Sequence, residues 1–314
     1  MGPIGPIMEQ EEGYPMRIIR VSAIVLAAAV LAAACSAAQD PAAKPSREFA
    51  DVVYAKVGDR ELHIDIAVPE DGAGKLHPAV VWIHGGGWKA GTHKMNLARS
   101  LTDYGCVVAS VEYRLSGEAI FPAQITDCKA AIRFLRAKSK DYGIDPDRIG
   151  VWGGSAGGHL VALLGTTAGM KELEGDYGNV GVSSKVQAVC DFYGPADLTV
   201  VPEIAVKKKK PGPVAELLGG KPTEKPELAK LASPIYFVSR DAPPFLLVHG
   251  DKDPLVPIAQ SEKFYEALKK AGVDATFIRV KDGGHGFSRS GIEPTWAEIM
   301  KSVREFFDRH LKNG

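Results

Sequence analysis

The feature that most constrains the fold is a series of short apolar runs, rich in β-branched residues, that alternate with longer amphipathic stretches. The runs show no polar alternation, which is typical of strands buried on both faces of a sheet. They cover residues 79–83, 106–111, 149–152, 186–189, 245–248 and 276–280. The amphipathic stretches include residues 123–139, 258–271 and 294–311. Strands alternating with helices predict an α/β protein with a mostly parallel, twisted sheet and helices on both faces.

An antiparallel edge is expected before the first of these runs. Residues 52–57 and 62–68 alternate apolar and polar side chains around Gly58-Asp59, a pair typical of a hairpin turn. A chain of 314 residues can bury one large core. Residues 51–314 are therefore predicted to form a single α/β domain.

The N-terminal residues carry the pattern of a targeting signal. Arg17 and Arg20 precede an uncharged apolar run at residues 21–34, and small residues follow at 36–38. This pattern predicts a secretory signal peptide within residues 1–38, and therefore an exported protein. Lipid attachment at Cys35 remains an alternative, and it would be the only membrane contact that we expect. Residues 39–50 are polar and contain two prolines, which predicts a flexible tether.

The charge balance excludes several classes of partner. Lysine plus arginine number 38 and aspartate plus glutamate number 38, so the chain lacks the basic surplus that nucleic acid or anionic lipid requires. The spacing of histidines and cysteines matches no zinc motif, and no cofactor is expected. Beyond Cys35, the cysteines are Cys106, Cys128 and Cys190; they allow at most one disulfide among themselves, and we favour buried, unpaired side chains. Nothing in the sequence predicts the oligomeric state.

The strongest chemical signal is the segment from Gly153 to Gly157, with the sequence GGSAG, which follows one predicted strand and opens a helix. A serine at such a turn stands clear of the sheet with its hydroxyl exposed, because the flanking glycines allow a turn too tight for side chains. The helix N-terminus behind it favours negative charge. Ser155 is therefore the candidate nucleophile. A phosphate-binding loop is the alternative, but the Gly-Lys-Ser/Thr ending of a nucleotide site is missing.

A serine nucleophile needs a base, and in this kind of site the chain order is nucleophile, acid, histidine. The histidines after Ser155 are His159, His249, His285 and His310. Only His285 follows the last predicted strand in a glycine-rich loop that can bring an imidazole back to the serine. His285 is therefore the candidate base.

The acid is expected at the end of the preceding strand, where two carboxylates lie close together. Residues 249–254 read HGDKDP and offer Asp251 and Asp253. Asp253 begins the turn that leads into the next helix, so we choose it, and Asp251 remains the alternative as a turn or capping residue. The acid would hold the tautomer of the histidine and stabilise the imidazolium.

A fourth element, His84-Gly85-Gly86-Gly87-Trp88, follows the predicted strand at residues 79–83. Consecutive glycines let backbone N–H groups approach a substrate oxygen, and together with the N–H of Ala156 they would form an oxyanion hole. A flexible loop without function is the alternative, but it does not explain the position at a strand end of the same sheet. His84 is expected to brace the loop.

Taken together, these motifs resemble the α/β-hydrolase serine esterases, in particular the hormone-sensitive-lipase-like and bacterial feruloyl-esterase-like branches. The resemblance covers about residues 50–312 and rests on HGGGW at 84–88, EYRL at 112–115, DPDRI at 145–149, GGSAGGH at 153–159, DFYGP at 191–195, HGDKDPLVP at 249–257 and GGHGF at 283–287. It implies the α/β-hydrolase fold and carboxylic-ester hydrolysis by Ser155, Asp253 and His285, with Gly86, Gly87 and Ala156 as oxyanion donors.

Two departures from the family pattern affect the expected substrate. Many relatives carry an acid directly before the nucleophile, whereas this chain has Gly154. Only the tether precedes the sheet here, whereas hormone-sensitive-lipase-like members build a cap from an N-terminal helical segment, so we expect a more open cleft. The substrates predicted are short-chain esters and acetyl or feruloyl esters on plant polysaccharide. A small-peptide hydrolase and a catalytically silent binding domain are the alternatives.

One segment interrupts the alternation of strands and helices. Residues 194–232 are rich in proline, contain four consecutive lysines at 207–210 and hold a short helical piece near 214–218. Ligands of open α/β sheets bind at the carboxyl ends of the strands, so a segment that leaves such an end emerges beside Ser155. We predict a partial lid over the acyl side, and a solvated surface excursion is the alternative.

Overall fold

The computed structural model describes residue 2 and residues 46–70, 74–200, 212–287 and 290–312. The predicted signal peptide, Cys35, most of the predicted tether and the lysine run at 207–210 lie outside these residues, so those expectations stay predictions. The chain divides into two units, Met1–Gln39 and Asp40–Gly314, and the description below concerns the second.

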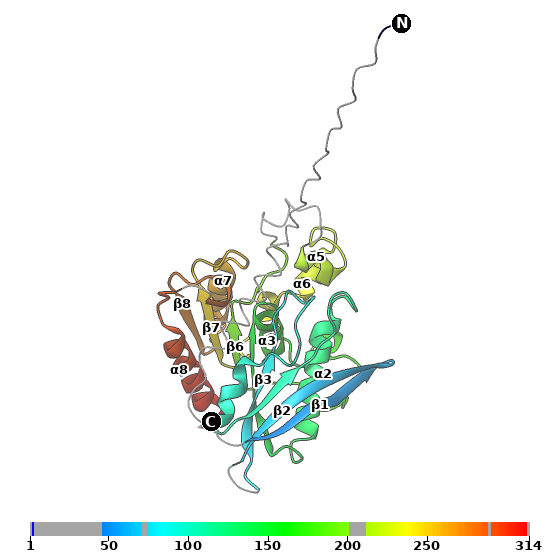
Figure 1. Ribbon diagram of the computed structural model, residues 1–314, viewed down its shortest axis with the longest axis vertical. Helices are drawn as coiled ribbons and strands as arrows, with labels where there is room; N and C mark the ends of the chain where they lie inside the picture. The colour runs from blue at the N-terminus through cyan, green and yellow to red at the C-terminus, as the bar shows by residue number, and fades with distance from the viewer. Residues whose placement is uncertain (1, 3–45, 71–73, 201–211, 288–289, 313–314) are drawn as a thin grey trace. The chain divides into compact units, whose positions relative to one another are not determined.

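Eight strands form one sheet in the order β1-β2-β4-β3-β5-β6-β7-β8. The strands are β1 Ser46–Val57, β2 Arg60–Pro69, β3 His77–Ile83, β4 Val107–Val111, β5 Ile144–Gly154, β6 Ala188–Phe192, β7 Phe245–Gly250 and β8 Ala275–Val280. β2 pairs antiparallel with β1 and β4, and every pair from β4 to β8 is parallel. Figure 1 shows β1 and β2 at one side of the sheet and β7 and β8 at the other. The predicted parallel sheet with an antiparallel N-terminal edge is confirmed.

Several strand boundaries differ from the prediction. β5, for example, begins at Ile144 instead of residue 149, and the ends of β1 and β6 show the physical reason. β1 begins at Ser46, so residues 46–50 of the predicted tether belong to the sheet, where Ser46 pairs with Pro69. β6 covers Ala188–Phe192 instead of residues 186–189. Both boundaries depend on pairing with a neighbouring strand, because Ala188 is the first β6 residue to match β5, opposite Gly150.

Helices cover both faces of the sheet, as predicted. The α-helices are α2 Ala123–Ala137, α3 Ala156–Thr166, α4 Lys171–Glu174, α5 Pro213–Leu218, α6 Pro226–Leu231, α7 Ala259–Lys270 and α8 Trp296–Phe307, and a 3₁₀ segment, η2, covers Leu97–Tyr104. Buried side chains of α2, α3 and α7 share one apolar cluster with one side of the sheet. Those of η2 and α8 form a second cluster on the opposite side.

The C-terminal helix illustrates how local sequence and sheet packing agree. Thr295 caps α8, because its hydroxyl accepts from the Glu298 N–H while the Glu298 carboxylate accepts from the Thr295 N–H, a capping box. At the other end of the helix, Phe307 and Leu311 lie against the bare backbone of Gly150, where a Cβ would come within 2.9 Å of both side chains. A glycine in β5 therefore allows the close approach of this layer.

Within the described part of the chain, no helix combines the length and the apolar character that crossing a bilayer requires. Cys106, Cys128 and Cys190 are buried and unpaired, as expected for small apolar side chains. Burial raises the pKa of the Cys106 thiol to about 11, which keeps it protonated near neutral pH.

Candidate active site

Ser155 occupies a strained turn between β5, which ends at Gly154, and α3, which begins at Ala156. Its backbone has φ 58° and ψ −119°, a region that residues with a side chain rarely adopt. The turn is held because the Ser155 N–H donates to Phe192 O at 2.8 Å, at the end of β6. Glycine is required at Gly157, since a Cβ there would lie 2.0 Å from the carbonyl oxygen of Ile83.

The structure brings the three predicted site residues into one hydrogen-bonded line. His285 Nε2 lies 2.9 Å from Ser155 Oγ, and His285 Nδ1 lies 2.7 Å from Asp253 Oδ2. Because a carboxylate only accepts, Nδ1 carries the proton of a neutral ring, and Nε2 is free to accept from the serine hydroxyl. This is the arrangement that a general base needs before it removes the serine proton.

The carboxylate of Asp253 is fully buried but well supplied with donors. Its Oδ1 accepts from the N–H groups of Leu255 and Val256 at 2.8 and 2.9 Å. Burial alone would raise the pKa of Asp253, but the hydrogen bonds from His249 and His285 outweigh it and hold the pKa well below its usual value. Asp253 is therefore ionised at every pH at which the fold is expected to work.

The glycine loop after β3 lies directly against the serine turn. A Cβ on Gly85 would come within 2.7 Å of Gly154 O, and Gly86 and Gly87 adopt φ values of 110° and 61°. Among the described residues, the backbone hydrogen bonds of the turns and loops include none donated by the N–H groups of Gly86, Gly87 and Ala156. Three N–H groups without such a partner, next to a strained serine, can donate hydrogen bonds to a developing oxyanion.

Two aromatic contacts brace this loop. The His84 ring stacks on Tyr113 at 4.2 Å, and the Tyr113 hydroxyl donates to His84 O at 3.0 Å. Burial lowers the pKa of His84 to about 4, so the ring is neutral near pH 7. The Trp88 indole N–H donates to His159 Nδ1 at 3.2 Å, and His159 Nε2 donates to Ala232 O at 2.6 Å. His159 thus joins the glycine loop, the serine helix and the end of α6.

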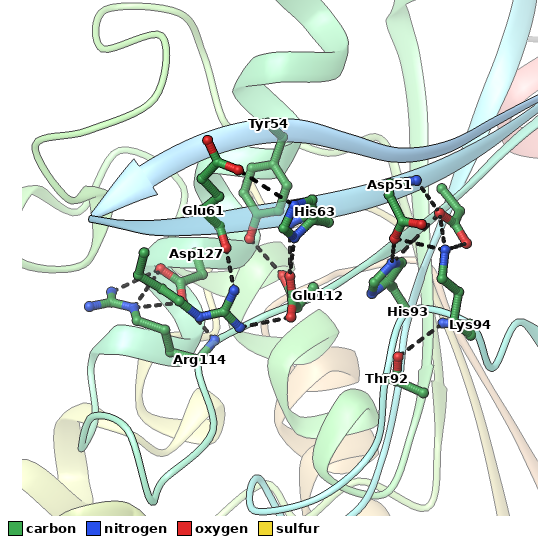
Figure 2. Close-up of polar contacts among 12 residues, drawn as sticks. Asp51, Tyr54, Glu61, His63, Thr92, His93, Lys94, Glu112, Arg114 and Asp127 are labelled. Atoms are coloured by element: carbon green, nitrogen blue, oxygen red, sulfur yellow. Dashed lines mark hydrogen bonds and ion pairs between the residues drawn. The ribbon is translucent and has the colours of Figure 1, made fainter. Parts of the chain in front are cut away.

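The segment that carries Tyr113 is itself fixed by ion pairs. Figure 2 shows Glu112 with its partners from β2 and Arg114 with the buried carboxylate of Asp127. The Glu112 carboxylate contacts Arg60 at 2.7 Å and His63 at 2.9 Å, and Arg114 contacts Asp127 at 2.8 Å. The charged residues of the EYRL motif therefore fix the segment that carries Tyr113, and Tyr113 in turn contacts the glycine loop at His84.

A second group in Figure 2 has the composition of a cation site but already holds a cation. Asp51, Asp65 and His93 bring one ligand atom each within 4.8 Å of one another. The ammonium of Lys94 lies 2.8 Å from Asp51 and 2.9 Å from Asp65. The lysine balances both carboxylates, so the group is explained as an ion-pair cluster.

Tyr193 explains the missing acid before the nucleophile. Its hydroxyl would lie 3.0 Å from a Cβ at Gly154, so the tyrosine occupies the space that a longer side chain there would need. The Tyr193 ring also packs 4.7 Å from the His285 ring. Nothing in the sequence predicts this role, because it depends on contacts between the end of β5, the turn after β6 and the loop after β8.

The segment predicted as a lid contacts the glycine loop through α5. The Lys89 ammonium lies 3.0 Å from the Glu216 carboxylate, and a Cβ on Gly87 would lie 3.3 Å from Pro213. On the other side of α5, the Phe121 N–H donates to Leu217 O at 2.8 Å. The described part of the segment therefore packs beside the candidate oxyanion donors.

Comparisons with known sequences place the chain among esterases. Residues 64–268 match the BD-FAE family. Esterase LipQ of Mycobacterium tuberculosis is 33% identical over 252 residues, which cover 79% of this chain and 59% of LipQ. The chain spans about half the length of the curated relatives it matches.

The solved structures that the chain resembles are also esterases. A truncated carbohydrate esterase from gut microbiota superposes with a TM-score of 0.75 at 35% identity, over 87% of this chain and 100% of that one. An acetyl ester-xyloside bifunctional hydrolase from Caldicellulosiruptor lactoaceticus has a TM-score of 0.67 at 30% identity, over 80% of this chain and 88% of that one.

Proposed function

The chain belongs to the BD-FAE family of α/β-hydrolases, and from this premise we propose that it is a serine carboxylesterase acting through an acyl-enzyme. The observation that carries the proposal is the hydrogen-bonded line from Ser155 through His285 to Asp253. The names of the relatives, esterases and carbohydrate esterases, support the same reaction.

In the proposed first step, Ser155 Oγ attacks the carbonyl carbon of the ester while His285 Nε2 takes the hydroxyl proton. The imidazolium that forms is stabilised by the ionised carboxylate of Asp253 through the Nδ1–H bond. The negative charge that develops on the carbonyl oxygen is stabilised by hydrogen bonds from the N–H groups of Gly86, Gly87 and Ala156. Each such donor contributes about 3–4 kcal/mol to the transition state in comparable sites.

In the proposed second step, His285 gives its proton to the departing alcohol, and the acyl group remains on Ser155. Water then repeats the sequence, with His285 as the base and Ser155 as the leaving group. Two properties support this cycle. The serine lies on a backbone turn that holds its hydroxyl toward His285, and the low pKa of Asp253 keeps its charge in place throughout.

We propose short-chain acyl esters, and acetyl or feruloyl esters on carbohydrate, as the substrates. The structures of a carbohydrate esterase and of an acetyl ester-xyloside hydrolase among the neighbours support this choice. The balanced charge of the chain supports an uncharged substrate, since it offers no surplus for a polyanion.

A substrate panel tests the proposal. We expect the highest kcat/KM for nitrophenyl acetate or butyrate, a steep fall toward palmitate, and release of acetate from acetylated xylan or of ferulate from methyl ferulate. An aminoacyl nitroanilide is included to detect peptidase activity, and Ser155→Ala protein serves as the blank. Preference for palmitate without action on carbohydrate esters would contradict the substrate class, and turnover of the anilide alone would favour the peptidase alternative.

We also propose that residues 194–232 act as a partial lid over the acyl side. The contacts of α5 with the glycine loop support this role, because they bring Pro213 and Glu216 beside the candidate oxyanion donors. The segment carries none of the proposed catalytic groups, so we expect it to affect specificity.

Deletion of residues 201–212 tests the lid. We expect acetate esters to be turned over at nearly the original rate, while the ratio of butyrate to acetate rates changes, because the segment borders the acyl site. The matched control is deletion of residues 71–73, in the connection between β2 and β3. Unchanged ratios in the lid deletion would assign the segment to a surface excursion.

A further inference from the structure

A second histidine lies against the carboxylate proposed as the triad acid. His249, near the end of β7, is fully buried, and its Nε2 lies 3.3 Å from Asp253 Oδ2. That oxygen is the one that accepts from His285 Nδ1 at 2.7 Å. The reaction described above assigns no task to His249, although a buried imidazole is costly unless its nitrogens are satisfied.

The partners of His249 fix the orientation of its ring. Its Nε2 lies 2.9 Å from Val256 O, and a carbonyl can only accept, so Nε2 carries the proton. Its Nδ1 lies 2.7 Å from Ser261 Oγ, so the serine hydroxyl and the ring are hydrogen-bonded. Ser261 is buried in the first turn of α7. The ring is therefore held with its Nε2–H directed at the loop that follows Asp253.

The same contacts hold both oxygens of the carboxylate. Val256, whose carbonyl accepts from His249, donates its own N–H to Asp253 Oδ1 at 2.9 Å. His249 thus orients Oδ2 directly and Oδ1 through the Val256 peptide. With both oxygens held, the carboxylate cannot rotate away from His285.

We propose that His249, held by Ser261, is a positioning residue that fixes the Asp253 carboxylate for its bond to His285. The hydrogen-bonded line would then run from α7 through Ser261, His249, Asp253 and His285 to Ser155. The inference rests on the proposed function, because positioning matters only if Asp253 serves His285 in catalysis. Its effect is on catalytic geometry, and His249 touches no substrate.

The test compares two amides at position 249. Glutamine carries a side-chain N–H at the distance of Nε2, whereas asparagine is shorter and reaches only the position of Nδ1. We expect His249→Asn to lower kcat about tenfold to a hundredfold with KM unchanged, the range seen when residues that orient metal ligands are replaced. His249→Gln is expected to recover most of kcat. Ser261→Ala is expected to lower kcat less, because the ring keeps its contacts with Val256 and Asp253 and loses only its hydrogen bond to α7.

A buried histidine at the opposite end of the sheet provides the matched control. His77 begins β3 and contacts Gly105 O at 3.1 Å. We expect His77→Gln to lower the melting temperature without changing kcat. All variants are compared for folding by circular dichroism, and Ser261→Ala carries the test if His249→Asn does not fold.

Proton NMR gives a readout that general destabilisation does not move. The proton shared by His285 Nδ1 and Asp253 is expected far downfield, and it should shift in His249→Asn and Ser261→Ala but not in His77→Gln. If kcat and this signal are unchanged in both variants while Ser155→Ala abolishes turnover, the positioning role is wrong and the proposed function stands. If Ser155→Ala is fully active, the proposed function fails and the inference fails with it.

Discussion

Ser155→Ala is expected to lower kcat for nitrophenyl acetate by about 10⁴- to 10⁶-fold, because it removes the attacking oxygen while leaving the fold intact. The substitution keeps the Cβ, and the N–H that holds the turn still donates to Phe192 O. His285→Ala is expected to cost a similar factor. The double variant should be no slower than either single variant, since triad members act as a unit.

Covalent labelling measures the same assignment independently of turnover. An organophosphate should modify wild-type protein once, at the peptide that contains Ser155, and should leave Ser155→Ala unmodified. Ser184→Ala is the matched control, because that buried hydroxyl serves only an ion-pair cluster through Glu174 at 2.8 Å. Undiminished ester turnover by Ser155→Ala would rule out the nucleophile.

Much of the fold was predictable because its strands are buried on both faces. The continuously apolar run at residues 79–83 of β3, in which every residue is buried, is typical of a strand in a parallel sheet. Strand ends are different, since they depend on a partner. β1 begins at Ser46 only because Pro69 lies opposite, and nothing in residues 46–50 alone predicts this pairing.

The shifted β6 shows the same dependence on tertiary contacts. Val186 is apolar and is therefore predicted to belong to the strand. It is buried in the apolar cluster that α2, α3 and α7 share with one side of the sheet, but it precedes the first β6 residue. Gln187 uses both its backbone and its side chain on Ile149, as its N–H donates to Ile149 O and its Oε1 accepts the Ile149 N–H. The ladder with β5 then begins one residue later, so the apolar run and the strand do not coincide.

The candidate site was partly predictable because motif and chain order restrict the choices. The GGSAG turn, the last glycine-rich loop and the carboxylates after β7 are each recognisable from neighbouring residues. The supporting contacts are not, since they join distant positions. Trp88 and His159 are 71 residues apart, and the contact of Tyr193 with Gly154 joins the turn after β6 to the end of β5. His249 was weighed only as a base, although its position four residues before Asp253 is visible in the sequence.

The choice between the two carboxylates after β7 gives the second large expected effect. Asp253→Asn is expected to lower kcat by about 10⁴-fold, because an amide at this position favours the wrong tautomer of His285. An asparagine N–H facing Nδ1 leaves the proton on Nε2, where it blocks acceptance from Ser155 Oγ. The low folded-state pKa of Asp253 means that wild type keeps its carboxylate ionised, so the factor should be the same from pH 6 to 8, about two to four pH units above the usual aspartate pKa.

Asp251→Asn is the matched control, two residues away and outside the hydrogen-bonded line. The Asp251 side chain accepts from the Asp282 N–H at 2.8 Å, and an asparagine oxygen can accept the same bond. We therefore expect kcat unchanged in Asp251→Asn.

The two variants also differ in the pH dependence of their stability. The native pKa of Asp253 lies below its unfolded value, so its contribution to the free energy of unfolding is present above the unfolded pKa and is lost as the pH falls through the folded one. In Asp253→Asn, the free energy of unfolding should no longer show this decrease at low pH. Urea unfolding at a series of pH values measures it. An active Asp253→Asn beside an inactive Asp251→Asn would transfer the acid role to Asp251.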